Sequence, residues 1–111
     1  MMDVSTQGDV TLVRPAGRLD SANAPDLERQ LTERLDQGAQ RLLFDFSTLD
    51  YISSAGLRVV LLAGKRLRAS QGKLVLVGLG ELVREVFEMS GFLTLFEVHA
   101  TVDEGLAALA T

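Results

Sequence analysis

The nine residues LDYISSAGL, positions 49–57, decide how this chain folds, because a predicted buried strand precedes them and an amphipathic helix follows. The upstream run, residues 41–46, begins with Arg41 and is otherwise apolar apart from one acid, Asp45, which is typical of a central strand covered on both faces. The downstream run, residues 54–69, carries apolar residues at helical spacing. We therefore expect a loop over residues 47–53 and a helix that begins near Ser54.

Two small hydroxyl residues, Ser53 and Ser54, stand where the free backbone N–H groups of that helix point outward. Such a position favours negative charge, including phosphate. Ala55 and Gly56 would leave room for another protein to reach the serines. The same residues also fit a plain helix cap, and helix caps are far commoner than regulated sites.

Predicted strands and helices alternate along the rest of the chain, which favours a sheet with helices packed on it. Residues 4–16 are expected to form a hairpin, residues 73–77 a second buried strand, and residues 92–98 leave room for a short edge strand. Further helices are expected at about 24–37, capped by Asn23; at about 81–89, with Leu82, Val83, Val86 and Phe87 facing inward; and after Thr101. We predict one α/β domain over residues 1–111, with a mixed β-sheet and about four helices packed largely on one side.

Composition narrows the classes of function. The chain has 111 residues, 47% of them apolar, which suits one domain with a hydrophobic core. Its net charge of −4 argues against nucleic acid as the main partner. The absence of cysteine excludes disulfides and thiol catalysis, and no His or carboxylate spacing indicates a metal. Uncharged apolar runs such as residues 59–64 are too short to cross a bilayer, and residues 1–7 do not resemble a signal peptide. We expect a cytoplasmic protein with no direct membrane contact.

The segment 52–57 is similar to the signature of STAS domains, a family named for sulfate transporters and anti-sigma-factor antagonists. Gly17-Arg18-Leu19-Asp20 matches a second motif of that family, and the order of strands and helices agrees over nearly the whole chain. The resemblance implies that Ser54 is the phosphorylated residue and that Asp20 is an acid near it. The best-known antagonists have Asp where this chain has Ser53, although other members of the family carry Ser there.

The same resemblance implies a mechanism of partner switching. An unphosphorylated antagonist binds an anti-sigma factor that is also a serine kinase, phosphorylation of Ser54 breaks the complex, and a serine phosphatase resets it. The ATP site belongs to the kinase, so we expect this chain to need no cofactor. The partner-binding residues that it implies are Asp20, Ser53, Ser54 and Gly56. Helical spacing adds Arg58, which lies one turn after Ser54 and shares its face, although the same position also fits a solvated helix residue.

Two other functions stay open at this point. The first is a scaffold without phosphotransfer, as a STAS subunit of a lipid-transport ABC system or of a stress-signalling assembly. The second is a small hydrolase, which would need Ser54 with His99, the single histidine, and an acid such as Glu97. The glycine expected two places before a hydrolase serine is replaced by Ile52, so we expect a binding module and not an enzyme.

Overall fold

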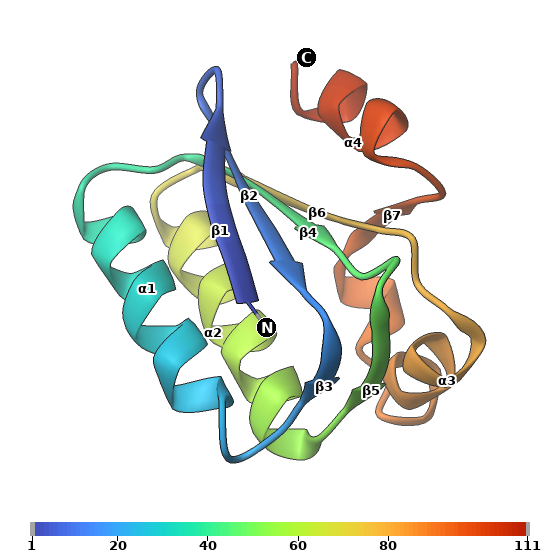
Figure 1. Ribbon diagram of the computed structural model, residues 1–111. Helices are drawn as coiled ribbons and strands as arrows, with labels where there is room; N and C mark the ends of the chain where they lie inside the picture. The colour runs from blue at the N-terminus through green and yellow to red at the C-terminus, as the bar shows by residue number, and fades with distance from the viewer. Residues whose placement is uncertain (1, 111) are drawn as a thin grey trace.

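A five-stranded sheet with the order β1-β2-β4-β6-β7 runs through the middle of the protein (Figure 1). The computed structural model describes residues 2–110. The predicted hairpin is formed by β1 (Met2–Gln7) and β2 (Val10–Pro15), which pair antiparallel. Parallel to β2 lie β4 (Arg41–Asp45), β6 (Lys73–Val77) and β7 (Glu97–His99), each paired with the strand before it in the order. The sheet is therefore mixed, as the sequence predicts.

Four helices cover the two faces of this sheet unequally. They are α1 (Ala24–Asp36), α2 (Ser54–Ala69), α3 (Glu81–Met89) and α4 (Val102–Leu109), and a short 3-10 turn, η1 (Leu93–Leu95), precedes β7. The first three helices contribute to the larger apolar core, whereas α4 packs against a separate cluster on the opposite face (Figure 1). The prediction of about four helices largely on one side is confirmed, with α4 as the exception.

The central strand β4 shows why the sheet is covered on both faces. Leu42 and Phe44 belong to the larger core, while Leu43, which points to the other face, belongs to the cluster under α4. At the strand's end Asp45 is 6% exposed and accepts hydrogen bonds from Arg14 Nε and the Ser47 N–H, both at 3.0 Å. Burial raises the pKa of Asp45, but these hydrogen bonds lower it by more. The pKa of Asp45 therefore lies below its usual value.

The expected loop over residues 47–53 is wrong in its middle. Four of its residues form β5 (Leu49–Ile52), which pairs in parallel with β3 (Gly17–Leu19) in a separate two-stranded sheet. Leu49 and Ile52 are buried, and the two residues between them are exposed. Two strands this short offer too few positions for an alternating pattern to be recognised, so their pairing was not predicted.

Two side chains take other positions than expected. Asn23 stands at the N-cap of α1 but makes no capping bond; its amide donates to the Arg18 carbonyl at 2.7 Å and accepts from the Asp20 N–H at 2.9 Å. Leu82 is 66% exposed and does not face inward, because Val83 and Phe87 occupy the inner face of α3. Through these two hydrogen bonds Asn23 holds the segment that precedes α1.

Candidate functional site

The two serines at the start of α2 have different local environments. Ser53 follows β5, and its N–H donates to the Leu19 carbonyl at 2.9 Å. Ser53 is also the N-cap of α2, and its hydroxyl accepts from the Gly56 N–H at 3.3 Å. Ser54 is the first helical residue, is exposed, and its hydroxyl forms no hydrogen bond with any residue from 2 to 110. One serine therefore caps the helix, and the other presents a free hydroxyl to solvent.

Gly56 fixes where the first turn of α2 lies. It is buried, and a Cβ added to it would lie 2.7 Å from Leu19 Cγ and 3.0 Å from both the Leu19 carbonyl oxygen and Ile52 Cγ1. Only glycine lets the helix approach β3 and β5 this closely. The expectation that Gly56 opens space for a partner is therefore wrong, because this residue faces the core.

The pairing of β3 with β5 brings the second predicted motif to the serines. Leu19 stands opposite Ile52, so Asp20 and Ser53 are the next residues at the same end of two neighbouring parallel strands. The Asp20 carboxylate accepts from the Ala22 N–H at 3.0 Å and lies 3.6 Å from Arg18 Nε. Asp20 is thus held locally beside the start of α2, although no hydrogen bond joins it to Ser54 among the described residues.

An exposed cation–aromatic pair adjoins this site and escaped the sequence analysis. The Arg18 guanidinium lies 4.2 Å from the centre of the Tyr51 ring, across the β3–β5 pair. Tyr51 is 40% exposed. Because the two strands were not expected to pair, no signal in the sequence placed these side chains together.

Arg58 lies one turn along α2 from Ser54 and is exposed. Its guanidinium forms no ion pair or hydrogen bond within residues 2–110. The structure thus gathers Asp20, Ser53, Ser54 and Arg58 around the start of α2, with Gly56 beneath them.

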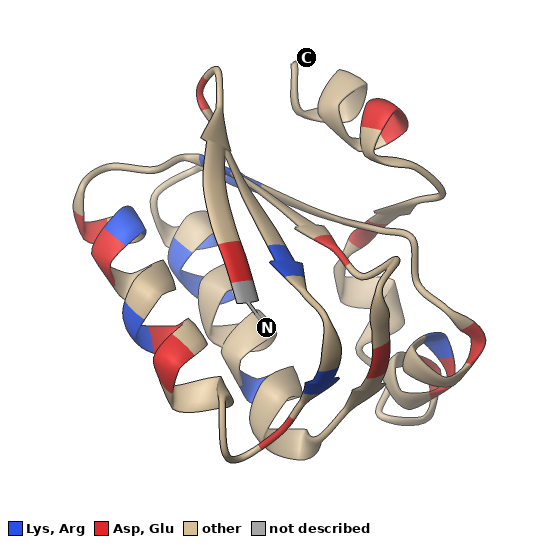
Figure 2. Ribbon diagram, in the orientation of Figure 1, with Lys and Arg blue, Asp and Glu red and all other residues tan. Residues whose placement is uncertain are grey.

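The first turn of α2 lacks an acid, unlike the first turns of the other three described α-helices. Those helices carry Asp26, Glu81, Asp103 and Glu104 there, where a negative charge is stabilised by the helix dipole. In α2 all the charged residues are cationic (Figure 2). A negative group placed on Ser54 would therefore meet the positive end of the helix dipole without repulsion from within its own turn.

Of the three residues considered for hydrolysis, Ser54 is not connected to the other two. His99 Nε2 lies 2.7 Å from Glu97 Oε2 on β7, and no hydrogen bond links His99 to Ser54 in the part of the chain that the structure describes. Across that same part, no group of three or more His, Cys, Asp or Glu could hold a metal ion. None of the helices within residues 2–110 is long and apolar enough to cross a membrane.

Comparison with known proteins shows which family the chain resembles. The family model described as "STAS domain" matches residues 1–105. The "Putative anti-sigma factor antagonist BtrV" of Bordetella bronchiseptica is 53% identical over 95 residues, which cover 86% of this chain and 82% of that protein.

Solved structures show the same fold. A crystal structure of an anti-sigma factor antagonist from Mycobacterium paratuberculosis has a TM-score of 0.90 and 23% identity, covering 100% of this chain and 94% of its own. The Bacillus cell fate determinant SpoIIAA in its phosphorylated form has a TM-score of 0.81 and 23% identity, and the match covers 97% of this chain and 98% of the SpoIIAA chain.

Proposed function

We propose that this chain, which belongs to the STAS domain family and to its anti-sigma factor antagonists, acts by partner switching. Unphosphorylated, it binds an anti-sigma factor that is also a serine kinase, and phosphorylation of Ser54 releases it. The observation that carries the proposal is the exposed hydroxyl of Ser54 at the start of α2, which has no hydrogen-bond partner within residues 2–110 and lies beside a serine that is already used as the cap. The phosphorylated form of SpoIIAA, which shares this fold, is consistent with it.

The covalent step would take place in the kinase's ATP site. The Ser54 oxygen attacks the γ-phosphorus of ATP, a bond forms between them, and the bond from that phosphorus to the β-phosphate oxygen breaks to leave ADP. A base of the kinase takes the hydroxyl proton. A serine phosphatase reverses the state by adding water across the phosphoester, which restores the hydroxyl and releases inorganic phosphate. We place this cycle in the cytoplasm, without nucleic acid or membrane as a direct partner.

The fold would tolerate the phosphate because of where Ser54 lies. A phosphate adds about −1.5 to −2 charges at neutral pH. At the start of α2 these charges meet the positive end of the helix dipole and no acid in the first turn. The phosphate would therefore act on the partner and not by unfolding the helix.

The partner surface in this proposal consists of Asp20, Ser53, Ser54 and Arg58, and Gly56 serves it by keeping the first turn against Leu19. Against one partner carboxylate about 5 Å away, at an effective dielectric near 20, each unit of added charge costs on the order of 3 kcal/mol before screening. Half of that still exceeds the ~1.4 kcal/mol that weakens binding tenfold.

The test is titration calorimetry against the purified anti-sigma partner. Phosphorylated protein and Ser54→Glu should bind at least about tenfold more weakly than unmodified protein, whereas Ser54→Ala should bind about as well, because it loses little volume and no charge. Peptide mapping after incubation with the kinase should place phosphate on Ser54 in wild type and in Ser53→Ala. Equal affinity of the phosphorylated and unmodified proteins would rule out switching and favour the scaffold role, in a lipid-transport ABC system or a stress-signalling assembly.

A charge-reversal pair locates the interface. Arg58→Glu should weaken binding, because Arg58 shares a face with Ser54 and has no partner within residues 2–110 that already engages it. Arg68→Glu, at the far end of the same helix, is the matched control and should leave the affinity unchanged. Equal losses in both variants would indicate a general effect of net charge and not an interface at the start of α2.

A further inference from the structure

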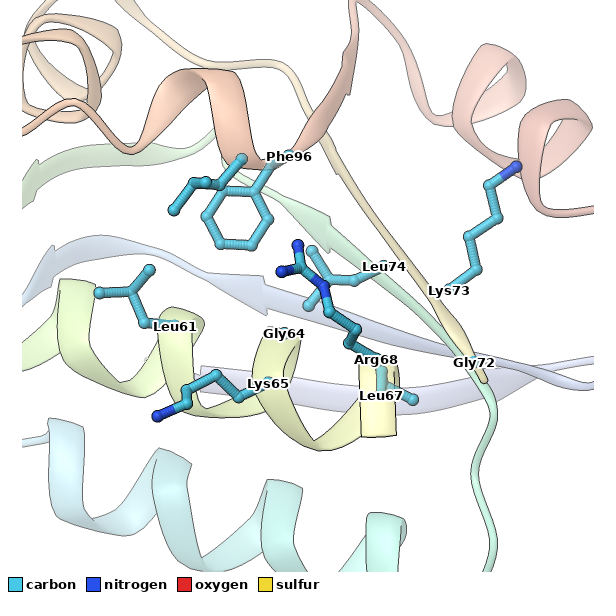
Figure 3. A pocket seen from close by; sticks show the side chains of 10 residues that line it. Leu61, Gly64, Lys65, Leu67, Arg68, Gly72, Lys73, Leu74 and Phe96 are labelled. Carbon is cyan, nitrogen blue, oxygen red and sulfur yellow. The ribbon is translucent and has the colours of Figure 1, made fainter. Parts of the chain in front are cut away.

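A cavity of about 240 Å³ opens at the opposite end of α2 from Ser54, between the C-terminal half of that helix, the start of β6 and the turn η1 (Figure 3). Its apolar wall comes from three elements: Leu61 from α2, Leu74 from β6, and Phe96 beside η1. Gly64 forms part of the floor, where a Cβ would lie 3.0 Å from the edge of the Phe96 ring. The cavity therefore has an apolar wall, which is formed by residues from distant parts of the sequence.

The charged residues that line this cavity are all cations: Lys65, Arg68 and Lys73. Lys73 is engaged elsewhere, because its ammonium donates to the Ala108 carbonyl at 2.9 Å and points away from the cavity (Figure 3). Lys65 and Arg68 form no hydrogen bond or ion pair through their side chains with any described residue. Arg68 extends over the cavity between Leu74 and Phe96.

Arg66, on the same turn of α2, has an ionic partner, unlike the two cations beside the cavity. Its guanidinium forms an ion pair with Asp36 at 2.9 Å, in the groove between α1 and α2. Asp36 of α1 thus neutralises the cation in that groove, whereas Lys65 and Arg68 beside the cavity have no acidic partner among the described residues. An anion that also has an apolar part is the complement of such a surface.

We propose that this cavity binds a small amphiphilic carboxylate, with its apolar body against Leu61, Leu74 and Phe96 and its carboxylate on the Arg68 guanidinium. A guanidinium presents a planar fork of N–H donors that matches the two oxygens of one carboxylate. The cavity is smaller than the roughly 300–1,000 Å³ typical of drug-sized sites, so the apolar body is short. Lys65 adds a second positive charge at the rim.

This site is separate from the proposed phosphorylation site. At 1.5 Å of rise per residue, the backbone positions of Ser54 and Arg68 are on the order of 20 Å apart along α2. The binding of a carboxylate therefore does not depend on the state of Ser54, and its test does not require the anti-sigma partner.

The experiment is an NMR titration of the full chain with hexanoate at pH 7, with 1-hexanol as the uncharged probe of equal chain length. Hexanoate should give saturable shifts in the amides of residues 61–74 and 95–96, and hexanol should bind at least about tenfold more weakly, because it cannot form the charge-assisted pair. Shifts that gather at the start of α2, an absence of saturable shifts, or equal affinity of the two probes would each overturn the proposal.

Two variants of equal charge provide the control. Arg68→Gln should weaken hexanoate binding about tenfold or more, while Arg66→Gln removes the same charge outside the cavity and should leave binding unchanged. Leu61→Trp, which fills the cavity, should abolish binding with the fold intact by its amide spectrum. Equal weakening by Arg68→Gln and Arg66→Gln would show only a general attraction of anions and would refute the proposal.

Discussion

The two ends of α2 differ in how tightly they are packed against the rest of the protein. At its start, Gly56 packs against buried Leu19 and Ser53 closes the helix with its hydroxyl, so backbone and cap are fixed and one serine is left exposed. Near its end, Gly64 meets only the edge of a half-buried aromatic ring, and a cavity with unpaired cations opens beside it. A tightly held start keeps a small polar group in one place, whereas a loosely filled end leaves room for a ligand.

Substituting the two glycines should reveal this difference most strongly. Gly56→Ala should lower the free energy of unfolding by about 1–3 kcal/mol, because its Cβ would overlap Leu19 in a filled core, against a gain of up to about 1 kcal/mol from helix propensity. Gly64→Ala should be neutral or slightly stabilising, since the Phe96 ring can shift by a few tenths of an ångström. Urea denaturation of both variants measures the contrast, and equal changes would contradict it.

The two serines should differ by a smaller amount. Ser53→Ala removes the cap hydroxyl that accepts from Gly56 and should cost about 1 kcal/mol of unfolding free energy. Ser54→Ala removes an exposed hydroxyl without a partner among the described residues and should change stability by less than about 0.5 kcal/mol. Thermal and urea unfolding of these matched variants checks the assignment. A larger loss for Ser54→Ala would mean that Ser54, and not Ser53, is the structural serine.

Much of this architecture was predictable from the sequence because its signals are local. The apolar run of β4 and the helical spacing in α2 gave the correct elements, and the helix start at Ser54 was placed correctly. The pairing of β3 with β5 was not predictable, because it joins segments about thirty residues apart through strands of three and four residues. The inward position of Gly56 and the Arg18–Tyr51 contact depend on that pairing and were missed with it.

The position of α4 and the presence of the cavity could not be predicted from the sequence, for a different reason. Helical periodicity shows that one face of a helix is buried, but not which face of the sheet it covers. In the sequence, Arg68 is one of four cations in residues 54–69 and nothing distinguishes it, because the wall formed by Leu74 and Phe96 comes from residues later in the chain. Sequence order alone did not reveal that these residues enclose a space.

The smallest expected effect concerns the helix dipole at the two ends of α2. Ser54→Asp should be more stable than its isosteric partner Ser54→Asn by about 0.3–1 kcal/mol, because only the Asp variant places negative charge at the positive end of the helix. At Ala69, the last residue of α2, the same Asp-for-Asn comparison should reverse sign, because the charge there meets the negative end of the dipole. Using Asn as the reference cancels differences in size and in most of the helix propensity.

Both differences should shrink as salt is added, since these exposed charges are screened over about 10 Å at 0.1 M ionic strength and over about 3 Å at 1 M. Urea unfolding of the four variants at low and at high NaCl measures the sign, the size and the screening together. Differences of the same sign at both ends would show that Asp acts through the net charge of the protein. Opposite signs that fade with salt would mean that the start of α2 is electrostatically prepared for a negative group, which is the property that a phosphate on Ser54 requires.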